Sequence, residues 1–206
     1  MYFCNNKQHK FLGDRSDNIY NFMVSGWGCV RKKDIMTLFD IPDTFFPNIM
    51  RYLAGNYDVV EEEDYFYISV YPGQKVSKKY MNALSVLIAI AAKNMDKVIT
   101  ITDNVYSSLF VAKMFIEDSK SKDIRTYYVI DTALVSVPFY ALEDVIKAEL
   151  SSNGFEVKNK LIIIVYEDTE LEYIDLKCQV FYAMHVNDGK KNRFRFYDNK
   201  QFKGDE

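Results

Sequence analysis

The chain has 206 residues, 49% hydrophobic and 27% charged, a globular composition that excludes a disordered or linker-like protein. Its formal net charge is −3, so the molecule is no polycation, and any binding to nucleic acid requires a local basic surface. Three cysteines and two histidines lie too far apart for a zinc site or a disulfide framework, which predicts a cytoplasmic protein without a cofactor.

The first part of the chain, residues 1–73, predicts short helices followed by a β-hairpin. Pro47 belongs in the first turn of a helix, and the apolar Ile49, Met50 and Leu53 share one face of it. The Pro72-Gly73 pair predicts a turn that ends this part. The expected elements are helices at 19–24 and 32–39, a third helix ending near residue 54, and strands at 57–60 and 65–70.

The second part, residues 74–206, alternates between predicted helices and strands. We expect helices at 78–93, 105–118 and 139–150, and strands at 97–102, 124–130 and 161–166. This alternation predicts a parallel sheet covered by helices, and the LIIIVY run at 161–166 suits its centre. An antiparallel hairpin is expected from 173–186 and 193–197, joined by a turn at Asn187-Asp188-Gly189.

Residues 30–69 read VRKKDIMTLFDIPDTFFPNIMRYLAGNYDVVEEEDYFYIS. Their order of helix, turn, helix and hairpin resembles a winged helix-turn-helix domain, and IMRYLAGNYDVV resembles the end of its recognition helix. The expected fold class is therefore an α+β winged helix-turn-helix domain at 1–73, followed by an α/β domain at 74–206. The α/β domain is expected to have a mostly parallel sheet and a C-terminal antiparallel hairpin.

The RKKDI sequence at 31–35 and the placing of a winged helix before an α/β domain resemble replication-relaxation-type proteins of plasmids and conjugative elements. The resemblance implies a DNA-binding regulatory or accessory protein of a mobile element, acting in plasmid replication or transcription regulation. We expect the second domain to form a homodimer or to bind a protein partner. The apolar run at 81–92 is too short to cross a bilayer, so no membrane association is expected.

A recognition helix places its N-terminal residues near base edges in the major groove of double-stranded DNA. Asn48 suits adenine, and Thr44 suits a phosphate or a thymine methyl group. The acidic run at 61–64 would repel phosphate from the wing, so the alternative is a winged helix used for protein association. The expected DNA contacts are Arg31, Lys32, Lys33, Thr44, Asn48 and Arg51.

Carboxylates that directly follow predicted strands provide a metal-binding alternative. The carboxyl ends of parallel strands share one sheet edge, and converging carboxylates there would suit Mg²⁺. An aspartate after a strand also caps the helix that follows, which is the simpler role for Asp103. The candidate metal ligands are Asp103, Asp131 and Glu167.

A second catalytic alternative lies near the C-terminus. Asp168, Asp175 and Lys177 resemble the PD-(D/E)xK nuclease motif, in which two acids bind the metal and the lysine orients a water. The leading Pro-Asp is missing, and acids alternating with lysines are also typical of an exposed strand. No enzymatic activity is therefore expected.

Overall fold

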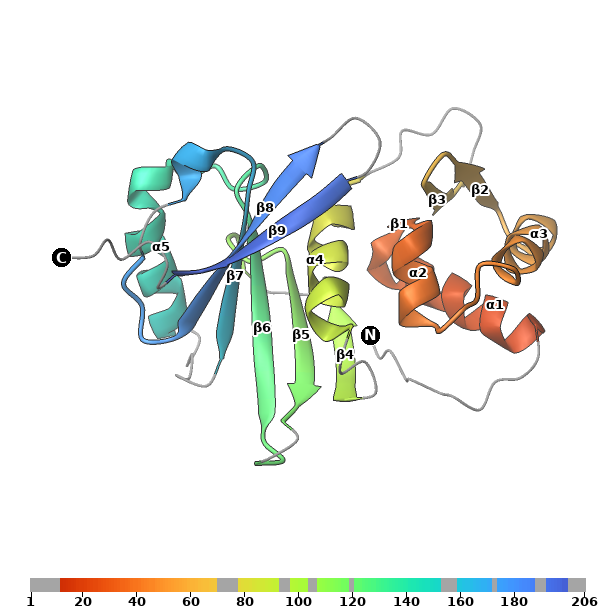
Figure 1. The fold of residues 1–206 in the computed structure, drawn as a ribbon, viewed down its shortest axis with the longest axis horizontal. Coiled ribbons are helices and arrows are strands. Elements are labelled where there is room, and N and C mark those ends of the chain that lie inside the picture. The colour runs from red at the N-terminus through yellow and green to blue at the C-terminus, as the bar shows by residue number, and fades with distance from the viewer. Residues whose placement is uncertain are drawn as a thin grey trace. The chain divides into compact units, whose positions relative to one another are not determined.

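The computed structural model is an α+β structure built around two sheets, one of three strands and one of six (Figure 1). It describes residues 12–69, 78–92, 97–103, 107–118, 121–152, 159–171, 174–187 and 192–199. The chain forms two compact units, Met1–Asp103 and Asn104–Glu206.

The first unit begins with the order helix, strand, helix, helix and hairpin. β3 lies between β1 and β2 and pairs antiparallel with both, so the hairpin joins the strand that precedes the second helix. The expected helices at 32–39 and up to residue 54 are confirmed, as is the hairpin. The elements are α1 (Leu12–Phe22), the π-helical turn η1 (Met23–Trp27), β1 (Cys29–Arg31), α2 (Lys32–Leu38), α3 (Phe46–Asn56), β2 (Val59–Glu62) and β3 (Tyr65–Ile68).

The sequence of α3 accounts for its limits. Pro47 lies in the first turn, where a missing amide hydrogen costs no helical bond. The helix continues through Gly55 and ends where Tyr57 takes up extended backbone, slightly later than the sequence predicts. Its buried face is made by Phe46, Ile49, Met50 and Leu53.

Two further elements complete the first unit, α4 (Met81–Ala91) and β4 (Val98–Thr102). α4 packs against β1 and α2, which explains why this unit extends to residue 103 instead of ending at the expected boundary near 73. Pro72 and Gly73 lie outside the described residues. Neither α4 nor any other helix in the described ranges is long and apolar enough to cross a membrane.

The second sheet has six strands in the order β4-β5-β6-β7-β8-β9. β7 is parallel to β6 and β8, as its apolar sequence predicts, and β8 and β9 form the expected antiparallel hairpin. β5 is antiparallel to β6, so the sheet is mixed; apart from the hairpin, the described strand pairs are parallel on both sides of β7 and antiparallel between β5 and β6. The elements of the second unit are β5 (Ala112–Glu117), β6 (Ile124–Asp131), α5 (Phe139–Ser152), β7 (Lys160–Val165), the 3-10 turn η3 (Asp168–Glu170), β8 (Gln179–Asn187) and β9 (Asn192–Asp198).

The helix predicted at 105–118 is wrong where the structure describes this segment, because β5 occupies its second half. Ala112, Met114 and Ile116 are buried in alternation with partly exposed neighbours, which is the period of a strand with one face in the core. Residues 104–106 of the predicted helix lie outside the described residues. Antiparallel pairing with β6 stabilises the strand conformation of residues 112–117.

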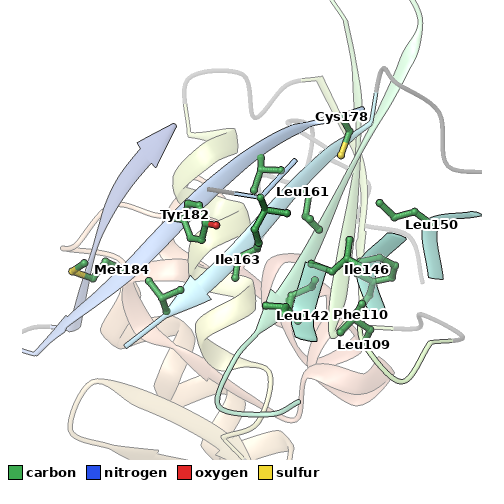
Figure 2. Packing of buried hydrophobic residues seen from close by; sticks show 14 residues of the cluster. Leu109, Phe110, Leu142, Ile146, Leu150, Leu161, Ile163, Cys178, Tyr182 and Met184 are labelled. Carbon is green, nitrogen blue, oxygen red and sulfur yellow. The ribbon is translucent and has the colours of Figure 1, made fainter. Parts of the chain in front are cut away.

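The core of the second unit lies between α5 and one face of its sheet (Figure 2). Leu142 and Ile146 of α5 are buried against Leu161 and Ile163 of β7 in one cluster. Tyr182 of β8 joins this cluster and is fully buried. α5 thus packs on the sheet through these side chains. It also forms the connection between β6 and β7, and a connecting helix is the arrangement expected between two parallel strands.

The π-helical turn η1 contains a backbone conformation that favours glycine. Gly26 has a φ of +143°, and a β-carbon there would lie 2.6 Å from Cγ of Asp103. Asp103 follows β4 directly, and burial raises the pKa of its carboxyl group. The end of the first unit therefore packs against the turn after α1.

Replacing Gly26 by alanine is expected to lower the free energy of unfolding by about 2–4 kcal/mol, from backbone strain and the clash with Asp103. The matched control is Gly55→Ala. Gly55 is helical and has open space around it. That change is expected to raise the free energy of unfolding by about 0.5–1 kcal/mol. Urea denaturation of the full chain measures both, and equal effects would contradict the strain at Gly26.

Candidate functional site

The solvent-facing side of α3 brings together polar residues that the sequence singled out. Asn48 and Arg51 are exposed on this helix, and Arg51 Nη1 donates to Asn48 Oδ1 at 3.4 Å. Thr44, in the turn before α3, is also exposed. These three side chains can reach a ligand without any rearrangement of the core.

Aromatic and hydrogen-bonding contacts anchor both ends of α3. Phe46 packs on Phe66 of β3, with ring centroids 6.0 Å apart. Beyond the other end, Tyr57 stacks on Tyr20 of α1 at 3.9 Å and donates its hydroxyl to Asp17 Oδ1 at 2.6 Å. The bond to Asp17 raises the pKa of Tyr57 to about 12. The exposed face of α3 is thus carried on a firmly held helix.

Arg31 points into the first unit. It is 8% exposed, and its Nη1 donates to the carbonyl of Met81 at 3.1 Å and to Ser85 Oγ at 2.5 Å. Its Nη2 donates to Asn82 Oδ1 at 2.6 Å. All three acceptors belong to α4, so this guanidinium is occupied inside the unit and is not available to a DNA phosphate.

Asp34 completes the buried polar group around Arg31. It is 8% exposed, and the hydroxyl of Ser85 donates to its Oδ2. Burial raises the pKa of the Asp34 carboxyl, while the bond from Ser85 and the charge of Arg31 oppose that rise. Arg31 Nε has no hydrogen-bond partner and lies 4.0 Å from Asp64 Oδ2.

The two lysines that follow Arg31 have different surroundings. Lys32 Nζ lies 2.5 Å from Glu61 Oε1 and also donates to the carbonyl oxygen of Glu63, so the β2–β3 hairpin holds it. Lys33 is exposed on α2. Of the basic run at 31–33, Lys33 is therefore the cation that faces solvent most directly.

The tip of the β2–β3 hairpin, residues 61–64, presents acidic side chains to solvent. Glu62 accepts hydrogen bonds from the hydroxyls of Tyr65 and Tyr67, the latter at 3.2 Å. The bond from Tyr65 lowers the pKa of Glu62. Glu61, by contrast, faces Lys32. The two neighbouring glutamates thus have separate partners.

The carboxylates proposed as metal ligands have other structural roles. Asp131 is 2% exposed, accepts from the hydroxyl of Tyr166 at 3.0 and 3.1 Å, and accepts from the amide of Ala133 at 3.1 Å. Burial raises the pKa of its carboxyl group. Glu167 is exposed and forms a capping box at η3. Among the described residues, no group of three acidic, histidine or cysteine side chains is arranged to hold a metal.

The residues of the nuclease alternative do not share a strand. Asp168 begins η3, and both Asp175 and Lys177 lie in the irregular segment before β8. The amide of Asp175 donates to Glu143 of α5 at 3.2 Å. All three predicted residues are exposed. The strand-borne arrangement of an acid and a lysine is absent from this part of the chain.

The acceptors of Arg31 were not predicted from the sequence. Asn82 and Ser85 are polar residues in an otherwise apolar helix, and Ser85 is buried. A buried hydroxyl requires a hydrogen-bond partner, so Ser85 was a signal that a polar group from elsewhere reaches α4. Nothing in the sequence near Asp131 indicates that Tyr166 is its partner.

Comparisons with known proteins supply no family. No family model and no curated protein matches the sequence. A solved structure of the central domain of yeast acetyl-CoA carboxylase is similar with a TM-score of 0.32 and 12% identity. The match covers 93% of this chain and 34% of that one, so the chain spans about a third of its length. A likeness this weak carries no functional argument.

Replacing Arg31 by leucine is expected to lower the free energy of unfolding by about 3–5 kcal/mol, because Asp34 would remain buried without its neighbouring cation. The control is Lys33→Ala, which removes an exposed cation and should change stability by less than about 0.5 kcal/mol. Urea denaturation measures both. Similar midpoints for Arg31→Leu and the native chain would contradict a structural role for Arg31.

Proposed function

We propose that the protein binds double-stranded DNA through the exposed face of α3, as a regulatory or accessory protein. The support begins with topology. In a winged helix-turn-helix, a helix and a strand precede the helix-turn-helix pair, and a hairpin pairs with that strand. The order α1-β1-α2-α3-β2-β3, with β3 between β1 and β2, agrees with this plan. α3 then corresponds to the recognition helix.

The observation that carries the proposal is the adjacent exposure of Asn48 and Arg51 on α3. An asparagine amide matches the N6 and N7 edge of adenine, and an arginine binds guanine or phosphate with two parallel hydrogen bonds. Their mutual contact is long at 3.4 Å, so either side chain can exchange it for a base or a phosphate. Thr44 lies just before them in the chain and adds a small hydroxyl donor.

Phosphate contacts would come from Arg51 and Lys33, both exposed. Arg31 is left out of this set because its guanidinium is bonded to α4. Lys32 can contribute only by exchanging its contact with Glu61. Few cations are therefore offered to the duplex, and we expect modest affinity with a shallow dependence on salt concentration.

The wider biological role rests on the resemblance to replication-relaxation-type proteins. That resemblance supports a cytoplasmic protein of a plasmid or other mobile element, acting in replication or transcription. The second unit is proposed to form a homodimer or to hold a protein partner. A dimer would present two α3 helices to two half-sites, which is how such proteins gain affinity from short contacts.

A protein-association module with the same fold is the second candidate. The acidic tip at 61–64 favours it, because four neighbouring exposed carboxylates oppose a phosphate backbone. In this case, the chain would bind no duplex at low salt and would instead form a stable complex with another protein. The nuclease alternative has no supporting cluster within the described residues.

Duplex binding is testable with a fluorescent pool of random-sequence DNA and anisotropy across a salt series. The variant Arg51→Ala is expected to weaken binding by about three- to tenfold and to lower the slope of log K against log salt by about one. Asn48→Ala should instead relax the preference among sequences selected from the pool, because its loss removes a base contact.

The control is Lys177→Ala, which also removes one positive charge but lies on the second unit. It is expected to leave both affinity and salt slope unchanged. A native chain that binds no duplex at low salt, or an Arg51→Ala variant that binds as tightly as the native chain, would refute the proposal.

A further inference from the structure

The tip of the β2–β3 hairpin contacts Lys32, the first residue of α2. The amide of Lys32 donates to the carbonyl oxygen of Asp64 at 2.9 Å. The Lys32 ammonium group lies 2.5 Å from Glu61 Oε1 and donates to the carbonyl oxygen of Glu63. One short hairpin thus supplies both the backbone and the side-chain acceptors of Lys32.

The acceptors around Lys32 are the kind that a DNA phosphate would supply. A carboxylate and a phosphate both offer anionic oxygens to an ammonium group at hydrogen-bond distance. The side chain of Lys32 keeps 24% of its surface exposed and that of Glu61 48%, so solvent and ligands can reach this ion pair. An exposed pair of this type is weak and can be exchanged for another anion.

We infer that the hairpin tip competes with DNA phosphate inside the protein: Glu61 and the Glu63 carbonyl hold Lys32, and a duplex must displace Glu61 to gain this cation. The inference rests on the proposed duplex binding by α3. The tip then limits the affinity of the first unit, because it withholds one cation and leaves only Lys33 and Arg51 of the proposed contacts as cations facing solvent.

Glu62 provides a matched control, because it carries the same charge on the neighbouring residue. Its carboxylate accepts from Tyr65 and Tyr67 and takes no part in holding Lys32. The variants Glu61→Gln and Glu62→Gln therefore change the net charge of the tip equally, and only Glu61→Gln releases the lysine. Because the cation coupled to Glu62 is Lys78 and not Lys32, a difference in the labelling of Lys32 reports on the ion pair with Glu61.

The first measurement needs no DNA. Lys32 is labelled with an amine-acylating reagent in the full chain, and its labelling rate relative to Lys33 is read by mass spectrometry. Glu61→Gln is expected to raise this ratio about two- to fivefold, since the lysine loses its carboxylate partner. Glu62→Gln should leave it unchanged. Equal ratios in the native chain and Glu61→Gln would overturn the inference whatever the DNA result.

The second measurement is duplex affinity by anisotropy at low salt. Glu61→Gln is expected to bind about three- to fivefold more tightly than the native chain, with a salt slope steeper by about one phosphate contact. Glu62→Gln should gain less than about twofold. In a Lys32→Ala background, Glu61→Gln should raise duplex affinity no more than Glu62→Gln does. The cation that Glu61→Gln would release is then missing.

The outcomes separate the two proposals. If the native chain binds duplex but Glu61→Gln and Glu62→Gln behave alike, the tip acts only through its total charge and the inference fails while the proposed function stands. If neither the native chain nor any variant binds duplex, the proposed function fails. The inference then fails as well, and faster labelling of Lys32 in Glu61→Gln would show only that the ion pair exists.

Discussion

The buried guanidinium of Arg31 is the constraint on which the first unit depends. A charged group removed from water is costly unless hydrogen bonds and an opposite charge offset its lost hydration. α4 supplies Arg31 with acceptors, and Asp34 lies in the same buried group. Sliding α4 along β1 would break several of these bonds at once, so the helix has one favourable position. α4 packs on β1 and α2 and does not cover the side of α3 that carries Asn48 and Arg51, which is exposed.

The same junction explains why a basic run in the sequence does not become a basic surface. β1 ends at Arg31 and α2 begins at Lys32, so successive side chains leave the backbone in different directions. Arg31 turns inward, Lys32 meets the hairpin, and Lys33 faces solvent. The net charge of a short segment is therefore a poor guide to the charge that a partner would encounter.

The elements predicted correctly are those whose local pattern agrees with their final packing. Pro47 and the apolar face of α3 are such a case, and so is the doubly buried run of β7. β5 was not predictable, because its apolar residues also suit a helix and only pairing with β6 decides between them. For the candidate site, the exposure of Asn48 and Arg51 followed from helical periodicity. The burial of Arg31 depends on Ser85, 54 residues away.

The close approach of Gly26 and Asp103 has a consequence for any attempt to isolate the α3-bearing region. Asp103 is the last residue of the first unit, and it packs beside a turn near the unit's beginning. A fragment cut after the hairpin at residue 69 would keep α3 and both hairpin strands. It would lose α4, leaving the arginine at the end of β1 without its acceptors and uncovering the turn at Gly26. A fragment that keeps these contacts around the α3-bearing region must therefore extend at least to Asp103.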